Sequence, residues 1–399
     1  MKLLGIDEHA LPAWLRDMSA ARDIVVTSAL VNAHDHLHLN NVPPLPQVGF
    51  FRNSYEWIDA FQPHFDAPDV KAALMIAKGE RMFHGAVKNL LCGATTVMHH
   101  DPWHAALDSE DFPVRVVRDY GWSHSLRLSQ SRQYGPSMVE SYMATPKDTL
   151  WFIHLAEGVD DVAAGELRML DALGCLQANT VVIHGVGLSD ADIALIIERG
   201  AHVVWCPSSN LRLFGQTISA PRLRRLFAAG LLAIGTDSRL TGAHDLLDEL
   251  RVARACSDFS SAELFTLATS MSRVALKCVD SCDDVIVFAD SCGDPFESLL
   301  NLRRGDLLAV IQRGKLMLID EGIHAQGGSS DPLLDLAVHQ EQASELGFHY
   351  LQDCSERVDR PVSKTSFASF ESVGVDGKQK FIARSVPEGL GAARELGLS

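Results

Sequence analysis

Two histidines that could bind one metal ion, His34 and His36, stand two positions apart at the end of an apolar stretch that begins at Ile24. Alternate residues of a β-strand face the same side, so a single strand would present both imidazoles to one cation. A His-x-His pair also occurs in solvated loops. The pair therefore indicates a metal site only if other segments supply further ligands.

Three other segments end in residues of the same kind. Segments 150–154 and 180–184 are apolar and end in His154 and His184, and segment 230–237 ends in Asp237. Nitrogen and oxygen donors with an open position form a hydrolytic site for zinc or a similar divalent ion, which lowers the pKa of its water and supplies hydroxide. Asp237 would bind the metal and take the proton of that water. Glu157, just past the strand that ends in His154, would protonate the leaving nitrogen.

The elements that must position these residues follow a regular alternation. Strand patterns alternate with amphipathic or capped helix patterns, which predicts parallel β/α units, and most of the strands are apolar on both faces, as buried parallel strands are. The expected strands are 94–98, 114–117, 123–128, 150–154, 180–184, 202–206 and 230–237, and the expected helices are 67–91, 163–173, 190–199, 220–229, 245–256 and 261–277.

The length from His34 to about residue 277 suits a TIM-like (β/α)8 barrel. With His34 on the first strand, His154, His184 and Asp237 fall on strands five, six and eight, and all would meet at the C-terminal mouth of the barrel. Little room for two full helices remains between residues 114 and 150. We therefore expect a shortened fourth unit.

The remaining segments predict a smaller domain and an extension. Strands 284–288, 307–311 and 316–319, the last two joined as a hairpin, would form a small β-sandwich-like domain with the N-terminal segment. The expected boundaries are 1–32 with 278–322 for this domain, 33–277 for the barrel, and 323–399 for a C-terminal extension of unknown role.

Composition argues against several classes of partner. The net charge is −16, from 35 Lys plus Arg against 51 Asp plus Glu, with no basic stripe, so we expect neither nucleic-acid nor membrane binding. Asp7 and Glu8 stand where a secretory signal needs apolar residues. The eight cysteines are scattered without a C-x-x-C pair, which favours a reduced, cytoplasmic protein; Cys278, Cys282 and Cys292 lack a companion histidine.

Several motifs together resemble the amidohydrolase superfamily, in particular its cytosine deaminase-like, chlorohydrolase-like branch, between about residues 24 and 320. They are Val31-Asn32-Ala33-His34-Asp35-His36, His154-Leu155-Ala156-Glu157, His184-Gly185, Cys206-Pro207-Ser208-Ser209-Asn210 and Thr236-Asp237-Ser238. The N-terminal part of the β domain is shorter than is usual in this family, and the segment after about residue 323 has no recognised counterpart.

The resemblance implies a mononuclear metal site. His34, His36, His154 and Asp237 would hold one divalent ion, with zinc favoured and iron or manganese open. His184 would bind the attacking water or the substrate, and Glu157 would move protons. Binuclear relatives use a carboxylated lysine on strand four, and residues 123–135 contain no lysine. By family analogy the protein could form a homodimer.

Other polar residues near the expected mouth are candidates for substrate binding: His99, His100, Gln130 and Asn210. Ordinary packing is the alternative for each, and Asn210 could equally brace a loop. The expected activity is deamination of a small nitrogen heterocycle by a metal-bound hydroxide. The alternatives are hydrolysis of a cyclic amide, as in imidazolone ring opening, and a barrel used only for binding. The retained set of ligands argues against the last.

Overall fold

The computed structural model describes residues 1–4, 6, 15, 23–46, 49–128, 137–278, 284–303 and 306–319, and the two strands at 368–375 and 378–385. The chain divides into two compact units, Met1–Gly327 and Gly328–Ser399. In the second unit, β14 (Ala368–Val375) and β15 (Lys378–Ser385) pair as antiparallel strands. The candidate Gln130 lies outside the described residues, and so does segment 11–21 apart from Leu15, where the sequence pattern predicts a helix.

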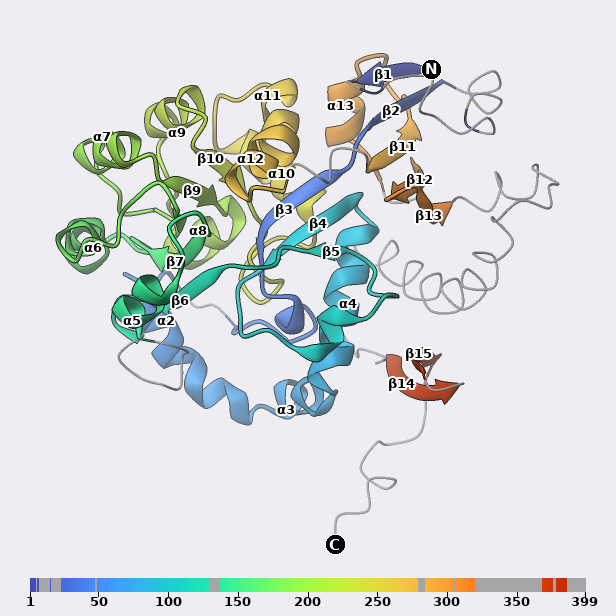
Figure 1. Ribbon diagram of the computed structural model, residues 1–399, viewed down its shortest axis with the longest axis horizontal. Coiled ribbons are helices and arrows are strands. Elements are labelled where there is room, and N and C mark those ends of the chain that lie inside the picture. The colour runs from blue at the N-terminus through green and yellow to red at the C-terminus, as the bar shows by residue number, and fades with distance from the viewer. Residues whose placement is uncertain are drawn as a thin grey trace, which may run out of the picture. The chain divides into compact units, whose positions relative to one another are not determined.

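Eight strands of the first unit run through a TIM-like barrel, which confirms the predicted fold class (Figure 1). Neighbours within each ladder are parallel, and the backbone N–H groups of Thr236 and Asp237 donate to the carbonyl of His34, so the last strand adjoins the first. The strands are β3 (Leu30–Asp35), β4 (Ala94–His99), β5 (Arg115–Val116), β6 (Gly121–Ser125), β7 (Trp151–Leu155), β8 (Thr180–His184), β9 (His202–Trp205) and β10 (Leu232–Ile234).

The ring of strands is interrupted between β5 and β6. Only residues 117–120 join these two strands, and a parallel crossover needs a dozen residues or more, so β5 and β6 do not pair with each other. The sequence predicted a shortened fourth unit. In the structure the helix is missing one step earlier, between the third and fourth strands, and α5 (Met138–Ala144) follows the fourth strand.

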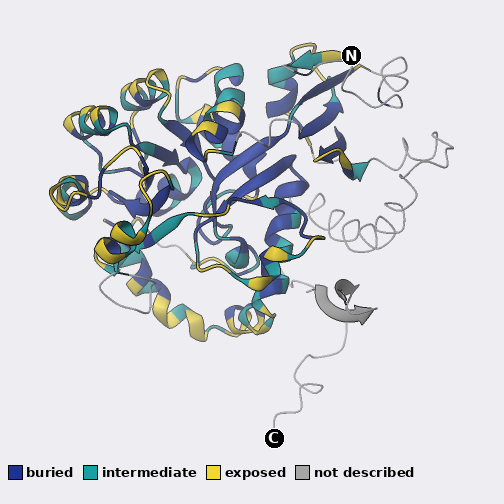
Figure 2. Cartoon of the chain, viewed as in Figure 1, coloured by how far each residue is buried: buried dark blue, intermediate teal, exposed yellow. Residues whose placement is uncertain are grey.

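Helices cover the outside of the barrel, with their exposed faces outward and the strands buried (Figure 2). Helix α7 begins with a capping box, in which the Ser189 hydroxyl accepts from Asp192 N–H and the Asp192 carboxylate accepts from Ser189 N–H, and it ends at Gly200 in the left-handed region, as its sequence predicts. The further α-helices are α2 (Ser54–Phe61), α3 (Pro68–Met75), α4 (Lys78–Leu90), α6 (Asp161–Ala172), α7 (Asp190–Arg199), α8 (Pro207–Phe214), α9 (Ala220–Ala228), α10 (Leu246–Ala255), α11 (Ser261–Thr266), α12 (Ser272–Ala275) and α13 (Pro295–Leu300).

Two expected helices are not continuous. The pattern at 67–91 predicted one helix, but Ile76 and Ala77 are extended and separate α3 from α4. Arg81 Nε donates to the carbonyl of Ile76 at 3.1 Å, which satisfies a carbonyl that the break exposes. The expected helix at 261–277 contains a π-helical segment, Leu267–Met271, between α11 and α12. Short 3₁₀ turns occupy Leu37–Leu39, Gln62–Asp66 and Ala105–Asp108.

A second, five-stranded sheet belongs to the same unit and contains the three late strands expected from the sequence. Its order is β1-β2-β11-β12-β13, with β2 leading directly into β3 of the barrel. Its bounds are β1 (Lys2–Leu4), β2 (Ile24–Ser28), β11 (Val285–Ala289), β12 (Leu307–Gln312) and β13 (Lys315–Ile319). Among the described residues, no helix has the length and apolar character that crossing a membrane requires.

Candidate metal centre

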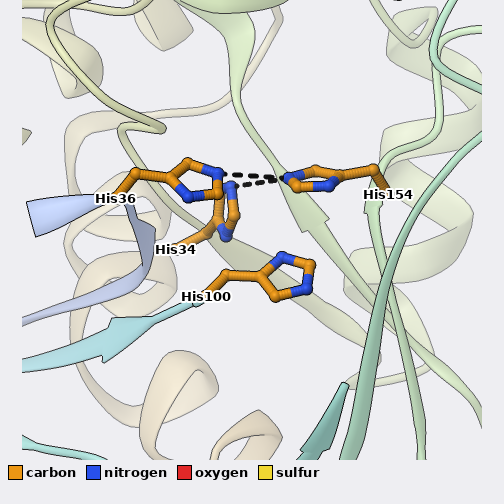
Figure 3. A group of neighbouring side chains, drawn as sticks. All are labelled: His34, His36, His100 and His154. Atoms are coloured by element: carbon orange, nitrogen blue, oxygen red, sulfur yellow. Dashed lines mark hydrogen bonds between the residues drawn. The ribbon is translucent and has the colours of Figure 1, made fainter. Parts of the chain in front are cut away.

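Three histidines from two distant parts of the chain converge at the mouth of the barrel (Figure 3). Nε2 of His154 lies 3.3 Å from Nε2 of His34 and 3.4 Å from Nε2 of His36. His34 is the fifth residue of β3, and His36 lies one residue beyond that strand. The β3–β4 register shifts between Asn32 and Asp35, an irregularity of the kind that redirects side chains at the end of a strand.

Hydrogen bonds to the opposite ring nitrogens determine where the lone pairs point. His36 Nδ1 lies 3.0 Å from an Asp101 carboxylate oxygen, and His154 Nδ1 lies 2.9 Å from the carbonyl of His124. These oxygens only accept, so each Nδ1 carries a proton, and in the neutral ring each Nε2 holds a lone pair. Two such lone pairs facing each other at 3.4 Å repel, and a metal ion or a shared proton between them removes that repulsion. The residues present therefore fit a metal ion.

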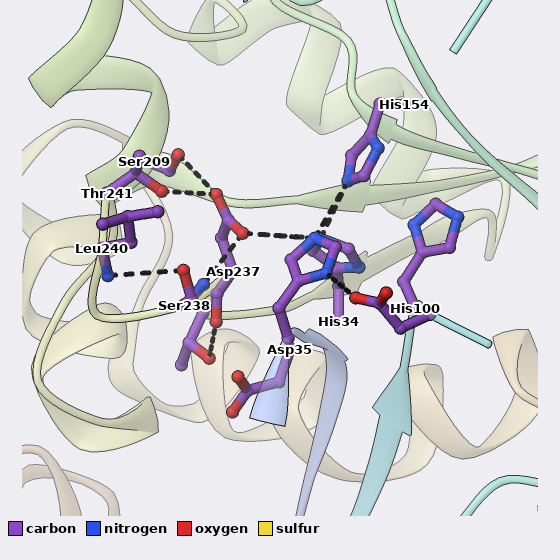
Figure 4. A network of polar contacts seen from close by, with 12 residues as sticks. His34, Asp35, His100, His154, Ser209, Asp237, Ser238, Leu240 and Thr241 are labelled. Carbon is purple, nitrogen blue, oxygen red and sulfur yellow. Dashed lines mark hydrogen bonds and ion pairs between the residues drawn. The ribbon is translucent and has the colours of Figure 1, made fainter. Parts of the chain in front are cut away.

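Asp237 adds an oxygen to the same cluster. Its Oδ1 lies 3.7 Å from Nε2 of both His34 and His36. Four donors at zinc-bond lengths in a tetrahedral arrangement would lie about 3.3–3.4 Å apart, close to the observed separations. The other carboxylate oxygen accepts from the hydroxyls of Ser209 at 2.8 Å and Thr241 at 2.6 Å (Figure 4). Burial opposes the charge, but His36, His184 and these hydroxyls keep the pKa of Asp237 lowered.

Glu157 and His184 form the next pair at the mouth. His184 Nδ1 lies 3.0 Å from the side-chain oxygen of Asn210, so its Nε2 is free to face Glu157 Oε1 at 3.6 Å. The Glu157 side chain is nearly buried, and burial raises the pKa of its carboxyl. A carboxyl of this kind beside an imidazole can take up and release a proton near the metal position.

The backbone bends sharply where three strands deliver these residues. Ala156, His184 and Asp237 have φ values of 51°, 75° and 55°, in the left-handed region that costs a non-glycine residue about 1–3 kcal/mol. Hydrogen bonds hold the bends at Asp237 and His184: Asp237 N–H donates to the His34 carbonyl at 3.0 Å, and Gly185 N–H donates to the Leu155 carbonyl at 3.1 Å. The strain is thus fixed by the strands on either side.

A buried acid that sequence reasoning missed supports the bend before Glu157. Glu166 of α6 accepts from Ala156 N–H at 2.7 Å, and its other oxygen accepts from the hydroxyl of Tyr55. Burial raises the pKa of Glu166 to about 7. A single Glu in an α-helix is expected to be exposed to solvent, so no sequence pattern predicts that Glu166 is buried.

Segment 52–54 packs against the loop that carries Glu157. Ser54 N–H donates to the Glu157 carbonyl at 2.9 Å, and Val159 N–H donates to the Arg52 carbonyl at 2.7 Å. A Cβ at Gly158 would lie 2.5 Å from the Arg52 carbonyl oxygen, so this approach requires glycine. Segment 52–54 thus helps to fix the position of Glu157.

Asp101 is the other missed residue of the site. Burial opposes its charge, but the hydrogen bond from His36 holds the pKa of Asp101 below its usual range. A carboxylate on the far nitrogen of a metal-binding histidine orients the ring and raises its basicity. The sequence feature that could have indicated Asp101 is its position directly after His99 and His100 at the end of a strand. No sequence pattern indicated that its carboxylate would hydrogen-bond to His36.

The predicted substrate-binding residues take different positions. Asn210 holds His184, as described above. His100 lies against the three converging histidines, with its ring centroid 4.4 Å from that of His154. His99 is also fully buried, and its Nδ1 accepts from Leu37 N–H at 3.2 Å.

A cavity of about 340 Å³ lies beside the interruption between β5 and β6. One wall is Asp101, the hydrogen-bond partner of His36, and another is Trp122, whose ring lies 5.5 Å from that of His100. Trp103 also lines it. Residues that line this cavity therefore contact the histidine cluster directly.

The chain is similar to several curated deaminases over part of its length. No family model matches. A 5-methylthioadenosine/S-adenosylhomocysteine deaminase from Pyrococcus furiosus is 28% identical over 244 residues, which cover 59% of this chain and 50% of that protein. A 5′-deoxyadenosine deaminase from Methanoregula boonei is 35% identical over 116 residues, or 27% of this chain and 26% of that one. The matches thus span a quarter to a half of these relatives.

Solved structures share the fold. An adenosine deaminase from Xanthomonas campestris with bound zinc has a TM-score of 0.58 at 20% identity, covering 80% of this chain and 85% of that one. An atrazine chlorohydrolase from Arthrobacter aurescens, complexed with zinc and atraton, has a TM-score of 0.57 at 16% identity, covering 76% and 87%. Fold and relatives together support the amidohydrolase superfamily, whereas the predicted branch within it stays a prediction.

Proposed function

We propose that this protein is a metal-dependent hydrolase that deaminates a nitrogen heterocycle. One observation carries the proposal. Nε2 of His36 and Nε2 of His154 face each other at 3.4 Å, with His34 and the Asp237 carboxylate beside them and with Glu157 and His184 adjacent. Four donors around one point and a proton-carrying pair next to them are the parts that hydrolysis of a carbon–nitrogen bond needs.

His34, His36, His154 and Asp237 would hold one divalent ion, and zinc is the metal we favour because the structural neighbours contain it. When bound, such an ion makes a water molecule acidic enough to act as hydroxide near neutral pH. The absence of a lysine from residues 123–135 supports a single ion.

The residues of the chain would then perform the proton transfers. Asp237 accepts a proton from the attacking water. His184, held by Asn210 with Nε2 inward, orients that water or the substrate. Attack at the carbon that bears the exocyclic amine forms a carbon–oxygen bond. Glu157 protonates the departing nitrogen, the carbon–nitrogen bond breaks, and ammonia leaves. The proton of the new hydroxyl moves to the ring nitrogen to give a carbonyl, and the proton held by Asp237 returns to Glu157.

The similarity to deaminases of 5-methylthioadenosine, S-adenosylhomocysteine and 5′-deoxyadenosine makes 5′-modified adenine nucleosides the substrate class that we propose. The test is ammonia release by the zinc-loaded full chain from these three nucleosides, with cytosine, an aminated triazine and a cyclic imidazolone as the other arms. We expect release from at least one nucleoside and loss of turnover in Glu157→Gln, which removes the acid but keeps the metal ligands. Ring opening of the imidazolone without ammonia release from any amine would contradict the proposal.

A further inference from the structure

His99 and His100 are adjacent at the end of β4, yet their hydrogen bonds place the ring protons on opposite nitrogens. Nδ1 of His99 accepts from Leu37 N–H at 3.2 Å, so the proton of neutral His99 is on Nε2. Nε2 of His100 lies 3.2 Å from the carbonyl of Ser123. A carbonyl only accepts, so Nε2 of His100 is protonated and its Nδ1 holds a lone pair.

Among the described residues, none donates to that lone pair. Nδ1 of His100 is buried there without a hydrogen-bond partner, and the residue is 1% exposed. A buried polar atom left unpaired costs about 1–3 kcal/mol, which calls for a bound group that satisfies it.

The His100 ring lies against the candidate metal ligands. Its centroid is 4.4 Å from that of His154 and 5.4 Å from that of His34. One donor atom from each of His34, His36, His100 and His154 lies within 4.8 Å of the other three (Figure 3). The Nδ1–H groups of His36 and His154 already donate to Asp101 and to the carbonyl of His124, so neutral His36 and His154 have no N–H left for His100. A cation at the centre of the cluster would satisfy all of these lone pairs together.

We propose that His100 is a fifth protein ligand of the metal ion, through Nδ1, in addition to His34, His36, His154 and Asp237. The inference rests on the metal centre of the proposed function. It gives the ion four imidazoles and one carboxylate, which leaves an open position for water only at a coordination number above five. Such a donor set suits iron, cobalt or nickel as well as zinc, and it departs from the tetrahedral shell of structural zinc sites.

The same reasoning argues against the neighbouring group of His38, His99 and Asp101, although its potential ligand atoms also lie within 4.8 Å of one another. The lone pair of His99 is taken by Leu37 N–H, and one carboxylate oxygen of Asp101 accepts from His36. His99 therefore provides a matched control. It is an adjacent, equally buried histidine whose free nitrogen carries a proton and cannot bind a cation.

The experiment uses Co²⁺ as the probe and compares the wild-type chain with His100→Ala and His99→Ala. Affinity for Co²⁺ is measured by competition with a chelator, and the visible absorption of the Co²⁺-loaded protein reports the coordination number. Thermal unfolding with and without Co²⁺ separates loss of a ligand from loss of packing, because a ligand contributes only to the metal-linked increase in Tm. His100→Gln provides a second variant that keeps the side-chain volume close to that of histidine.

We expect both His100 variants to bind Co²⁺ at least about tenfold more weakly and to show the stronger absorption of a lower coordination number, while His99→Ala binds like the wild type. Wild-type affinity and spectrum in the His100 variants would overturn the proposal and leave the metal centre intact. Equal weakening in His99→Ala, or the same loss of Tm with and without Co²⁺, would also overturn it, since both mean lost packing. Absence of Co²⁺ binding by the wild type would overturn this inference and the proposed centre together.

Discussion

The backbone N–H of Asp237 donates to the backbone carbonyl of His34 at 3.0 Å and so joins two candidate metal ligands across the closure of the barrel. The side chain of Asn32 strengthens the same junction, because its oxygen accepts from Thr236 N–H at 3.1 Å and its amide donates to the Thr236 hydroxyl at 2.8 Å. The geometry of the centre thus depends on how closely β3 approaches β10.

Gly235 permits that approach. A Cβ at this position would lie 2.6 Å from the backbone nitrogen of His34. Because that atom belongs to the backbone, strand β3 would have to move to make room. We expect Gly235→Ala to lower the free energy of unfolding by about 1–3 kcal/mol or more and to weaken metal binding. Gly165→Ala is the control: its Cβ would meet nothing within 4 Å in α6, and it should leave metal binding unchanged and stabilise the protein by up to about 1 kcal/mol. Denaturant unfolding and metal titration of both variants check this, and unchanged metal affinity in Gly235→Ala would contradict it.

Asp101 orients His36 through a 3.0 Å hydrogen bond. Removal of the acceptor in Asp101→Ala should weaken metal binding about 10- to 100-fold, the usual cost of losing a carboxylate behind a metal-binding histidine. Asp101→Asn keeps an oxygen that can accept from Nδ1 and should lose less. Competition with a chelator measures both variants, and equal affinities for wild type and Asp101→Ala would show that His36 is held by other contacts.

Asn210 fixes which nitrogen of His184 faces Glu157. We expect Asn210→Leu to reduce kcat for ammonia release about 100-fold, with full metal content, because a misoriented group at the reacting centre costs about that much. Asn210→Asp keeps the acceptor and should retain more activity. A drop in metal content in Asn210→Leu that matches the loss of kcat would instead make Asn210 part of the support of the metal.

The buried Glu166 should make stability depend on pH. Burial raises its pKa to about 7 from an ordinary 4.5, so between these values the folded protein holds a proton that the unfolded chain has released. The contribution of Glu166 to the free energy of unfolding is therefore highest below pH 4.5 and falls as pH rises to 7, by at most about 1.4 kcal/mol per pH unit. Glu166→Gln cannot titrate, so the difference between wild type and variant should change across this window and level off above it. A constant difference from pH 4.5 to 8 would refute this.

The candidate ligands could be predicted from the sequence because each stands at the end of a recognisable strand pattern. His154 and His184 each follow a run of buried apolar residues, and parallel strands bring such ends to one mouth. Asp101 and Glu166 could not be assigned in the same way, since their partners His36 and Ala156 are fixed only by three-dimensional proximity. The missing helix lies before β6, one unit earlier than predicted. The expected strands at 114–117 and 123–128 already left no room for a helix between them, but the prediction considered only the total length from 114 to 150.

The tautomers of His99 and His100 could not be predicted from the sequence either. The two residues are identical in type and adjacent, and only their contacts with Leu37 and Ser123 distinguish them. A sequence motif can place a histidine at a strand end. Its tautomer, and thus whether it can bind a cation, depends on the backbone group that the fold sets against it.

The most direct test of the metal centre is the position of the ion in crystals of the zinc-loaded protein, measured by anomalous scattering at the zinc absorption edge. We expect one peak within bonding distance of Nε2 of His34, His36 and His154 and of Oδ1 of Asp237. A peak among His38, His99 and Asp101 instead, or no peak in protein exposed to excess zinc, would contradict the assignment of these four residues as ligands.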